Sequence, residues 1–147
     1  MSIFDSFSIN ASGLTAERYR MDVISENIAN IDTTRTEDGT PYRRKLVTFE
    51  EKGKNGTFAF ALAKAKGDYI GGGVRVGKTY EDTETEMKMV YDPSHPDADE
   101  NGYVTYPNVN VITEMTDLID ASRSYEANAT AFSASKSMAV KGLEMAQ

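Results

Sequence analysis

The chain has 147 residues, a formal net charge of −7 and no cysteine. This length fits one domain, or one small domain with helical extensions. The acidic balance argues against a nucleic-acid ligand, because surfaces that bind nucleic acids are basic. The lack of cysteine excludes disulfides, thiol nucleophiles and cysteine-ligated zinc. Membrane insertion is not expected, since no apolar run approaches the roughly 18 residues of a spanning helix.

Residues 3–31 are predicted to form the first long helix. One of its faces carries a row of apolar residues at a spacing of seven, namely Phe7, Leu14, Met21 and Ile28. A second row passes through Ile24 but also through the polar residues Asn10 and Glu17, so the apolar stripe is interrupted. The first residues lack a basic segment followed by an apolar core, and no cleavable secretion signal is predicted.

Two amides, Asn27 and Asn30, lie near the predicted end of this helix at a spacing that places them on one face. Asparagine is unfavourable inside helices, so the pair indicates a specific role. The side chains can bond the last carbonyls of the helix, or they can bond across to a packed helix. Both alternatives give a polar clasp without a chemical reaction.

The middle of the chain is predicted to hold a polar loop over residues 32–41 and then a small β-rich insert. Strands are expected at residues 42–50, 74–80, 85–91 and 103–106. Residues 57–65 are ambiguous, because aromatic and leucine residues alternate with alanine as in a strand, whereas the alanine content also suits a helix.

Charge is unevenly distributed over this insert. Residues 32–80 carry 10 Lys/Arg and 6 Asp/Glu, a net of +4, and residues 81–100 carry 1 Lys and 8 Asp/Glu, a net of −7. One interpretation is a solvated surface with chance clustering. The other is a bipolar module whose acidic end meets the basic end of a neighbour.

No catalytic, cofactor or metal site is predicted. Residues 97–102, DADENG, resemble the first half of a calcium loop, but the glutamate required at the last position is replaced by Asn108. His95 is the only histidine, and without cysteine it forms neither a nucleophile–base pair nor a common zinc site.

The last segment, residues 110–147, is predicted to be a single long helix with Asn110 as its N-cap. One face of this helix carries a row of residues at a spacing of seven, which we call its seam, namely Leu118, Tyr125, Phe132 and Ala139. A second row beside it contains Met115 and Leu143. Such a helix would be roughly 50 Å long and cannot bury its stripe against a small domain alone. We expect it to pair with residues 3–31, either as a hairpin that covers a sheet or as a coiled coil completed by neighbouring subunits.

Several motifs in combination resemble those of the bacterial flagellar rod and hook proteins. They are SGLTA at residues 12–16, SENIAN at 25–30, DTT at 32–34, YRRK at 42–45, YDP at 91–93, GYV at 102–104 and ASRSYEAN at 121–128. The resemblance covers residues 3–145, and the short insert is similar to that of the proximal-rod type. Each motif alone is shared among axial proteins, whereas the combination is specific.

The resemblance implies a non-enzymatic structural subunit that polymerises with sibling rod proteins into the drive shaft of the basal body, which crosses the periplasm. It implies export by the flagellar type III apparatus without a cleaved signal. The implied fold is α+β, with residues 1–31 and 110–147 paired as an antiparallel coiled coil and residues 32–109 forming the outer insert. The expected assembly residues are Leu14, Met21, Ile24, Asn27, Ile28, Asn30, Leu118, Tyr125, Phe132 and Leu143.

Two other classes remain open at this point. The chain can be another axial protein of the flagellum, such as the other proximal-rod subunit or a distal-rod or hook subunit, although distal-rod and hook proteins usually carry a larger insert. It can also be a non-flagellar coiled-coil scaffold. An enzyme is disfavoured, because the sequence offers no nucleophile–base pair.

Overall fold

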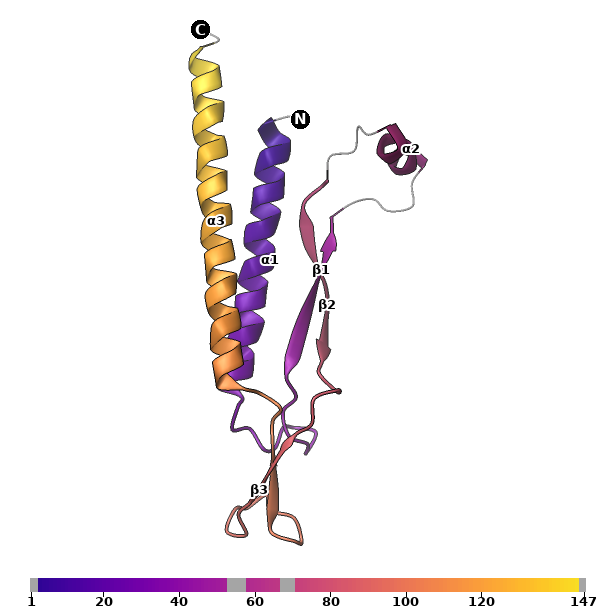
Figure 1. The fold of residues 1–147 in the computed structure, drawn as a ribbon, viewed down its shortest axis with the longest axis vertical. Coiled ribbons are helices and arrows are strands. Elements are labelled where there is room, and N and C mark those ends of the chain that lie inside the picture. The colour runs from indigo at the N-terminus through magenta and orange to yellow at the C-terminus, as the bar shows by residue number, and fades with distance from the viewer. Residues whose placement is uncertain (1–2, 53–57, 67–70, 146–147) are drawn as a thin grey trace. The chain divides into compact units, whose positions relative to one another are not determined.

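The computed structural model of the chain describes residues 3–52, 58–66 and 71–145. The class is α+β, with a long helix at each end and short strands between them (Figure 1). In chain order the elements are α1 (Ile3–Ala29), β1 (Lys45–Glu51), α2 (Phe58–Lys66), β2 (Val74–Glu81), β3 (Lys88–Tyr91), β4 (Tyr103–Tyr106) and α3 (Val111–Glu144). Within the described ranges, β1 pairs with β2 and β3 pairs with β4.

The predicted helices are confirmed, with small changes at their ends. α1 ends at Ala29 and the chain turns at Asn30, two residues before the predicted end of the helix at residue 31. Asn110 is the N-cap of α3, since its side-chain Oδ1 accepts the Ile112 N–H at 3.0 Å and the Thr113 N–H at 3.4 Å. Most of the ambiguous segment, residues 57–65, lies in the helix α2. Thr57, the first residue of that segment, lies outside the described residues.

Two strands begin later than predicted, and side-chain hydrogen bonds explain the difference. The strand expected from Thr85 begins at Lys88, because the Asp82 carboxylate accepts the N–H groups of Glu84 and Thr85, both at 3.0 Å, and thereby closes a turn. The strand expected from residue 42 begins at Lys45, because the Arg44 N–H donates to the Asn108 side chain and the Tyr42 N–H donates to the Thr33 carbonyl instead of to a neighbouring strand.

The chain divides into two compact units, each made from several segments. Unit 1 comprises Met1–Tyr19, Thr48–Gly77 and Ala121–Gln147, and unit 2 comprises Arg20–Val47 and Lys78–Asp120. Each unit therefore combines part of α1, part of α3 and part of the β-rich insert. The division into a helical core and an outer insert remains a prediction.

In unit 1, the described parts of α1 and α3 pack in antiparallel directions. The Phe7 and Phe132 rings meet edge to face, with centroids 5.1 Å apart. Farther along α1, Gly13 is buried against Asn128, and a Cβ at Gly13 would lie 2.8 Å from the Asn128 Oδ1. Glycine thus permits close approach of the helices here. Coiled-coil packing along the two helices remains a prediction.

The start of β2 is bound to α1 within the same unit. The Ser12 hydroxyl accepts the Val74 N–H at 3.0 Å and donates to the Ile9 carbonyl at 2.7 Å. Gly73 has a φ of +96°, and a Cβ there would lie 2.2 Å from the Ser12 Oγ. Gly73 is therefore required both for its backbone conformation and for this contact.

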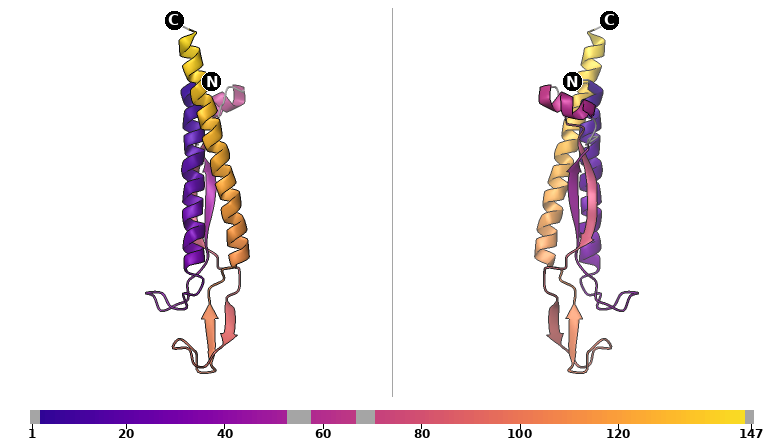
Figure 2. Two further views of the ribbon diagram at one scale, coloured as in Figure 1. Left: turned by 90° about the vertical axis from the view of Figure 1, so that its left-hand side faces the viewer. Right: turned by 90° about the vertical axis from the view of Figure 1, so that its right-hand side faces the viewer.

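Unit 2 has a small core in which polar and apolar side chains are mixed. Its buried residues include Val23, Ile24, Asn27, Tyr42, Asp82, Val104, Asn108 and Glu114. The antiparallel β3–β4 hairpin, whose strands lie side by side in Figure 2, pairs Met89 with Thr105 and Tyr91 with Tyr103. None of the described helices is both long and apolar enough for a bilayer span.

The N-cap gives a direct test of the α3 start. Asn110→Ala removes the acceptor for two helical N–H groups and should lower the free energy of unfolding by about 1 kcal/mol. Asn110→Ser retains a capping oxygen and should be nearly neutral. Urea denaturation followed by circular dichroism measures both variants, and equal stabilities for the alanine and serine proteins would contradict the cap.

Candidate functional site

Among the described residues, a polar cluster in unit 2 is centred on Asn27 of α1. Its side chain is 1% exposed. Its Oδ1 accepts the Tyr42 hydroxyl and the Lys45 N–H, both at 2.9 Å. Its amide nitrogen donates to the Lys45 carbonyl at 2.9 Å and to the Glu114 Oε2 at 3.0 Å. The amide therefore uses its two donors and two acceptor positions fully.

Glu114, in the first turn of α3, is a completely buried acid, with 0% exposure. Its Oε1 accepts the Arg44 Nε at 2.5 Å, while Oε2 accepts Asn27. The Arg44 guanidinium also reaches the Asp117 carboxylate at 3.2 Å, and Arg20 lies 3.9 Å from the same carboxylate. Burial of the Glu114 charge is thus compensated by a cation and by hydrogen bonds to both oxygens.

Asn108 extends the cluster to the loop between β2 and β3. Its Oδ1 accepts the Arg44 N–H at 2.8 Å. Its amide nitrogen donates to the carbonyls of Asp82 at 2.9 Å and Thr85 at 3.2 Å. One buried amide therefore supplies hydrogen-bond partners to the backbone N–H of Arg44 and to the backbone carbonyls of Asp82 and Thr85.

The two amides identified from the sequence have different partners, and each realises one of the two predicted alternatives. Asn30 bonds locally at the helix end, where it donates to the Glu26 carbonyl at 2.9 Å and accepts the Thr33 hydroxyl at 3.2 Å. Asn27 bonds across to Glu114 of α3. Glu114, Arg44 and Asn108 were not predicted, because each resembles many other charged or amide residues in the sequence.

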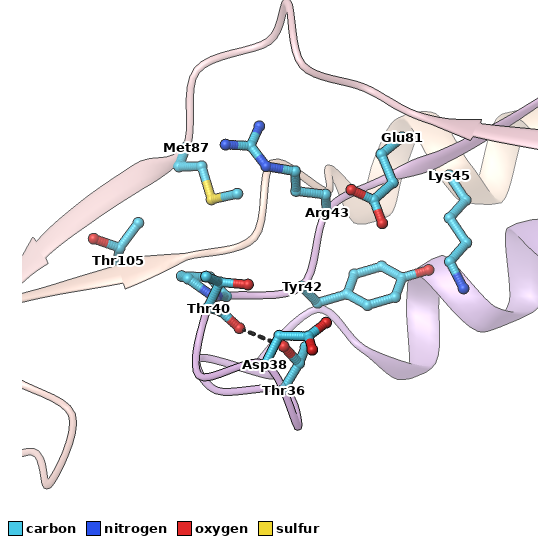
Figure 3. Close-up of a pocket in the computed structure, with 10 residues that line it drawn as sticks. Thr36, Asp38, Thr40, Tyr42, Arg43, Lys45, Glu81, Met87 and Thr105 are labelled. Carbon is cyan, nitrogen blue, oxygen red and sulfur yellow. Dashed lines mark hydrogen bonds between the residues drawn. The ribbon is translucent and has the colours of Figure 1, made fainter.

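An open cavity of about 470 Å³ lies beside the cluster, within unit 2 (Figure 3). Lys45 forms an ion pair with Glu26 and lies over the Tyr42 ring, with its Nζ 5.6 Å from the ring centroid. Glu81 and Asp38 also line the cavity. The lining of the cavity therefore carries charges of both signs.

Burial raises the pKa of the Tyr42 phenol from 10.0 to about 12, and the negative charges of Glu26, Glu114 and Glu81 add to the shift. The phenol is therefore held as a proton donor to Asn27 at all physiological pH values. The pKa values of two carboxyl groups are shifted in the opposite direction, below their usual value. Hydrogen bonds from Thr85 lower the pKa of Asp82, and those from Ser94 lower the pKa of Asp92.

Residues 97–102, which resemble the first half of a calcium loop, use their carboxylate oxygens for hydrogen bonds within the chain. The Asp97 carboxylate accepts the Thr34 hydroxyl at 2.8 Å and lies 3.7 Å from Arg35. The Asp99 carboxylate accepts the N–H groups of Asn101 and Tyr103, both at 2.8 Å. In the part of the chain that the structure describes, no three His, Cys, Asp or Glu side chains are grouped to hold a metal.

The expected assembly residues differ widely in their exposure. Ile24 and Asn27 are buried, and Leu143 is 71% exposed. The remainder are half-buried, namely Leu14, Met21, Ile28, Asn30, Leu118, Tyr125 and Phe132. α3 also exposes Ile112, Met115, Ile119 and Met138. Thus a single copy leaves much of the α3 apolar surface uncovered.

Comparisons with known proteins agree over the whole chain. Residues 7–35 match the family model described as "Flagella basal body rod protein", and residues 100–145 match "Flagellar basal body rod FlgEFG protein C-terminal". The flagellar basal-body rod protein FlgC of Bacillus subtilis is 45% identical and covers 99% of both chains. The protein of the same name from Escherichia coli O157:H7 is 38% identical and covers 100% of both.

Because Asn27 and Asn30 have different partners, their replacement by alanine should lower the free energy of unfolding by different amounts. Asn27→Ala leaves the Tyr42 hydroxyl, the Lys45 backbone and one Glu114 oxygen without partners, and should cost about 2–4 kcal/mol. Asn30→Ala removes only local bonds and should cost about 1 kcal/mol or less. Urea unfolding of the two matched variants measures the difference. Equal losses would show that the cross-element cluster adds nothing.

The pKa of Tyr42 predicts a loss of stability at alkaline pH. The unfolded chain loses the phenol proton near pH 10.0, whereas the folded protein retains it until about 12. The associated stabilisation is complete below pH 10 and is lost as the pH rises to about 12, at about 1.4 kcal/mol per pH unit.

Tyr42→Phe supplies the control for this effect. It should be less stable at neutral pH, because the hydrogen bond to Asn27 is absent. Its stability should fall less steeply between pH 10 and 12. Parallel slopes in urea titrations of the two proteins would contradict the assignment.

Proposed function

We propose how this chain, which belongs to the family of flagellar basal-body rod proteins and is a structural subunit of the bacterial flagellar rod, joins its neighbours. The terminal helices pair as an antiparallel coiled coil, and their uncovered apolar residues pack against neighbouring subunits. The chain polymerises with copies of itself and with sibling rod proteins into a helical tube. In that tube the packed helices form the inner part, the insert faces outward, and the helices transmit torque.

The exposed apolar surface of α3 is the observation that carries this proposal. Leu143 is 71% exposed and Ile112 is 78% exposed in the single copy. Full burial of one such side chain contributes about 1.5–3 kcal/mol. Assembly that covers several of them supplies a favourable free energy that the single chain does not use. The half-buried positions, such as Leu118 and Tyr125, complete the same seam.

The Asn27 cluster holds the end of α1 and the first turn of α3 in one register, and this register determines which apolar residues face a neighbouring subunit. In unit 2 it joins the end of α1, the start of β1 and the first turn of α3 through Glu114 and Arg44. A displaced register would leave the buried Glu114 charge without its partners, at a cost of several kcal/mol. The cluster thus acts as a polar register, with Asn30 closing the end of α1.

The subunit reaches its site through the flagellar type III export apparatus, without a cleaved signal peptide, and resides in the rod where it crosses the periplasm. Another axial subunit, or a non-flagellar scaffold, is the alternative. The match to FlgC proteins over 99–100% of both chains favours the rod subunit.

A change at Leu143 tests the proposed packing without disturbing the single chain. Leu143→Asp alters an exposed residue, so the stability of the isolated protein should be unchanged. In the rod the new charge would be buried without a partner, and incorporation should fall at least about tenfold. The measurement is immunoblotting of purified basal bodies, together with electron microscopy of the rod.

Leu143→Met is the matched control, because it retains an apolar side chain of similar volume and should assemble normally. If Leu143→Asp is incorporated as efficiently as Leu143→Met and the rods are intact, then the end of α3 is not a packing surface. If a strain that lacks the chain altogether builds intact rods, the proposed role in the rod is wrong.

A further inference from the structure

The start of α3, in unit 2, carries large apolar side chains on a face that is open to solvent. Ile112 is 78% exposed, Met115 is 54% exposed and Ile119 is 52% exposed. Their spacing of three and four residues places them side by side on the helix surface. Glu114 of the same helix segment is fully buried and marks its opposite side. We call Ile112, Met115 and Ile119 the α3 start face.

The charge around the α3 start face is negative. Residues 111–120 carry 3 Asp/Glu and no Lys/Arg, a net of −3. Two of these acids, Glu114 and Asp117, bind Arg44 within unit 2. The third acid, Asp120, is exposed and directly follows Ile119. A partner for this face therefore needs an apolar surface with a cation at its rim.

The end of α3, in unit 1, has a groove with these properties. The groove is open, has a volume of about 500 Å³ and lies along this one helix. Residues 127–143 carry 2 Lys and no Asp/Glu. Two rows of side chains, each with a spacing of four residues, border the groove. The lining residues are Ser133, Lys136, Ser137, Val140, Lys141 and Glu144.

The pairing with α1 leaves the last part of this groove open. Phe7 lies against Phe132, and α1 begins only four residues earlier, at Ile3. Because the two helices run in opposite directions, the last turn of α3 extends beyond the first described residue of α1 (Figure 1). Val140 and Lys141 are accordingly exposed in the single copy.

The α3 start face and the groove match position by position. A shift of 21 residues, which is three heptads, places Ile112 on Ser133, Ile119 on Val140 and Asp120 on Lys141. Large side chains of one surface thus meet smaller ones of the other, as a ridge fits a groove. The shift also places the exposed acid opposite a cation.

These two surfaces belong to one helix, which cannot fold back on itself, so a contact between them joins two copies of the chain. Two different and complementary surfaces produce a head-to-tail contact, and repetition of such a contact builds an open helical array. A self-complementary surface would instead stop at a dimer. The head-to-tail geometry fits a helical tube, in which all subunits point the same way.

We propose that the α3 start face of one copy packs, with the helices parallel, in the groove at the end of α3 of another copy in the assembled rod. This inference rests on the proposed function, since it names the partner of the uncovered α3 residues. The apolar side chains supply the attraction, and the pair of Asp120 with Lys141 sets the register.

Chemical cross-linking tests the contact, because the chain has no cysteine of its own. Thr116→Cys lies within the α3 start face and Ser137→Cys lies in the groove, and both positions are exposed. The two variants are expressed together in a strain that lacks the unchanged chain, and basal bodies are purified. A short bismaleimide should give a dimer that contains one copy of each variant, identified by mass spectrometry of the joined peptides.

Two controls accompany this experiment. The yield of dimer should fall at least severalfold when Ala131→Cys, an exposed position of α3 that does not line the groove, replaces Ser137→Cys. Thr116→Cys expressed alone should likewise give at least severalfold less dimer than the mixture. Equal yields from Thr116→Cys alone would indicate a self-complementary contact and would contradict the proposal.

The outcomes separate the contact from the function on which it rests. If both variants are incorporated into basal bodies but Thr116→Cys joins only a different rod protein, or joins nothing, the proposed contact is wrong and the rod role stands. If neither the variants nor the unchanged chain is found in basal bodies, the proposed function itself fails.

A charge exchange gives a second, independent readout. Asp120→Lys should reduce incorporation into basal bodies severalfold, and co-expression with a Lys141→Glu copy should reverse the effect at least in part. Circular dichroism of the purified variants checks that these exposed substitutions leave the fold intact. Loss of incorporation in Asp120→Lys with no recovery in the mixed strain would contradict the pairing of these two surfaces.

Discussion

A carboxylate removed from water persists as a charge only when a cation and hydrogen-bond donors replace the lost solvent. Glu114 meets this condition through Arg44 on one oxygen and Asn27 on the other. The rest of unit 2 depends on that constraint, because its partners come from α1, from the start of β1 and from α3. Displacement of any one element leaves a buried charge or amide unsatisfied, so the arrangement tolerates few alternatives.

The cluster also explains how a chain with so little apolar core adopts a defined structure. Buried polar networks contribute modestly to net stability, yet they discriminate strongly between registers. The apolar residues that would ordinarily supply stability, such as Ile112 and Met138 of α3, lie largely in water in the single copy. The isolated subunit is thus specified mainly by polar geometry, and a large part of its apolar free energy remains available for assembly.

The features predicted correctly from the sequence are those with local causes. The Asn110 cap and the end of α1 near Asn30 each follow from residues within one turn of each other. The strand start at Thr85 was predicted wrongly, because Asp82 diverts the backbone into a turn whose bonds a period-two pattern does not reveal. Residues 57–65 were ambiguous, because their alternation suits a strand and their alanine content suits a helix.

The candidate site was only half predictable for a related reason. The spacing of Asn27 and Asn30 marked a polar clasp, but the sequence did not show which amide bonds locally and which crosses to another element. Glu114 lies 87 positions from Asn27 and is one of 23 acidic residues, so nothing local distinguishes it. Its role depends on the tertiary fold, which brings a cation from the start of β1 to the first turn of α3.

The family models match residues 7–35 and 100–145, which include most of α1 and α3, so sibling proteins of the family would resemble this chain in its terminal helices. Apolar packing is strong but nondirectional, so a stripe that accepts one neighbour accepts its relatives nearly as well. Discrimination between neighbours then requires surfaces that lie outside the seam and vary in charge. The insert carries charge of both signs, with a net of +4 over residues 32–80 and −7 over residues 81–100, so a wrong partner there would juxtapose like charges. We therefore propose that the helices supply most of the free energy of assembly and that the insert supplies its specificity.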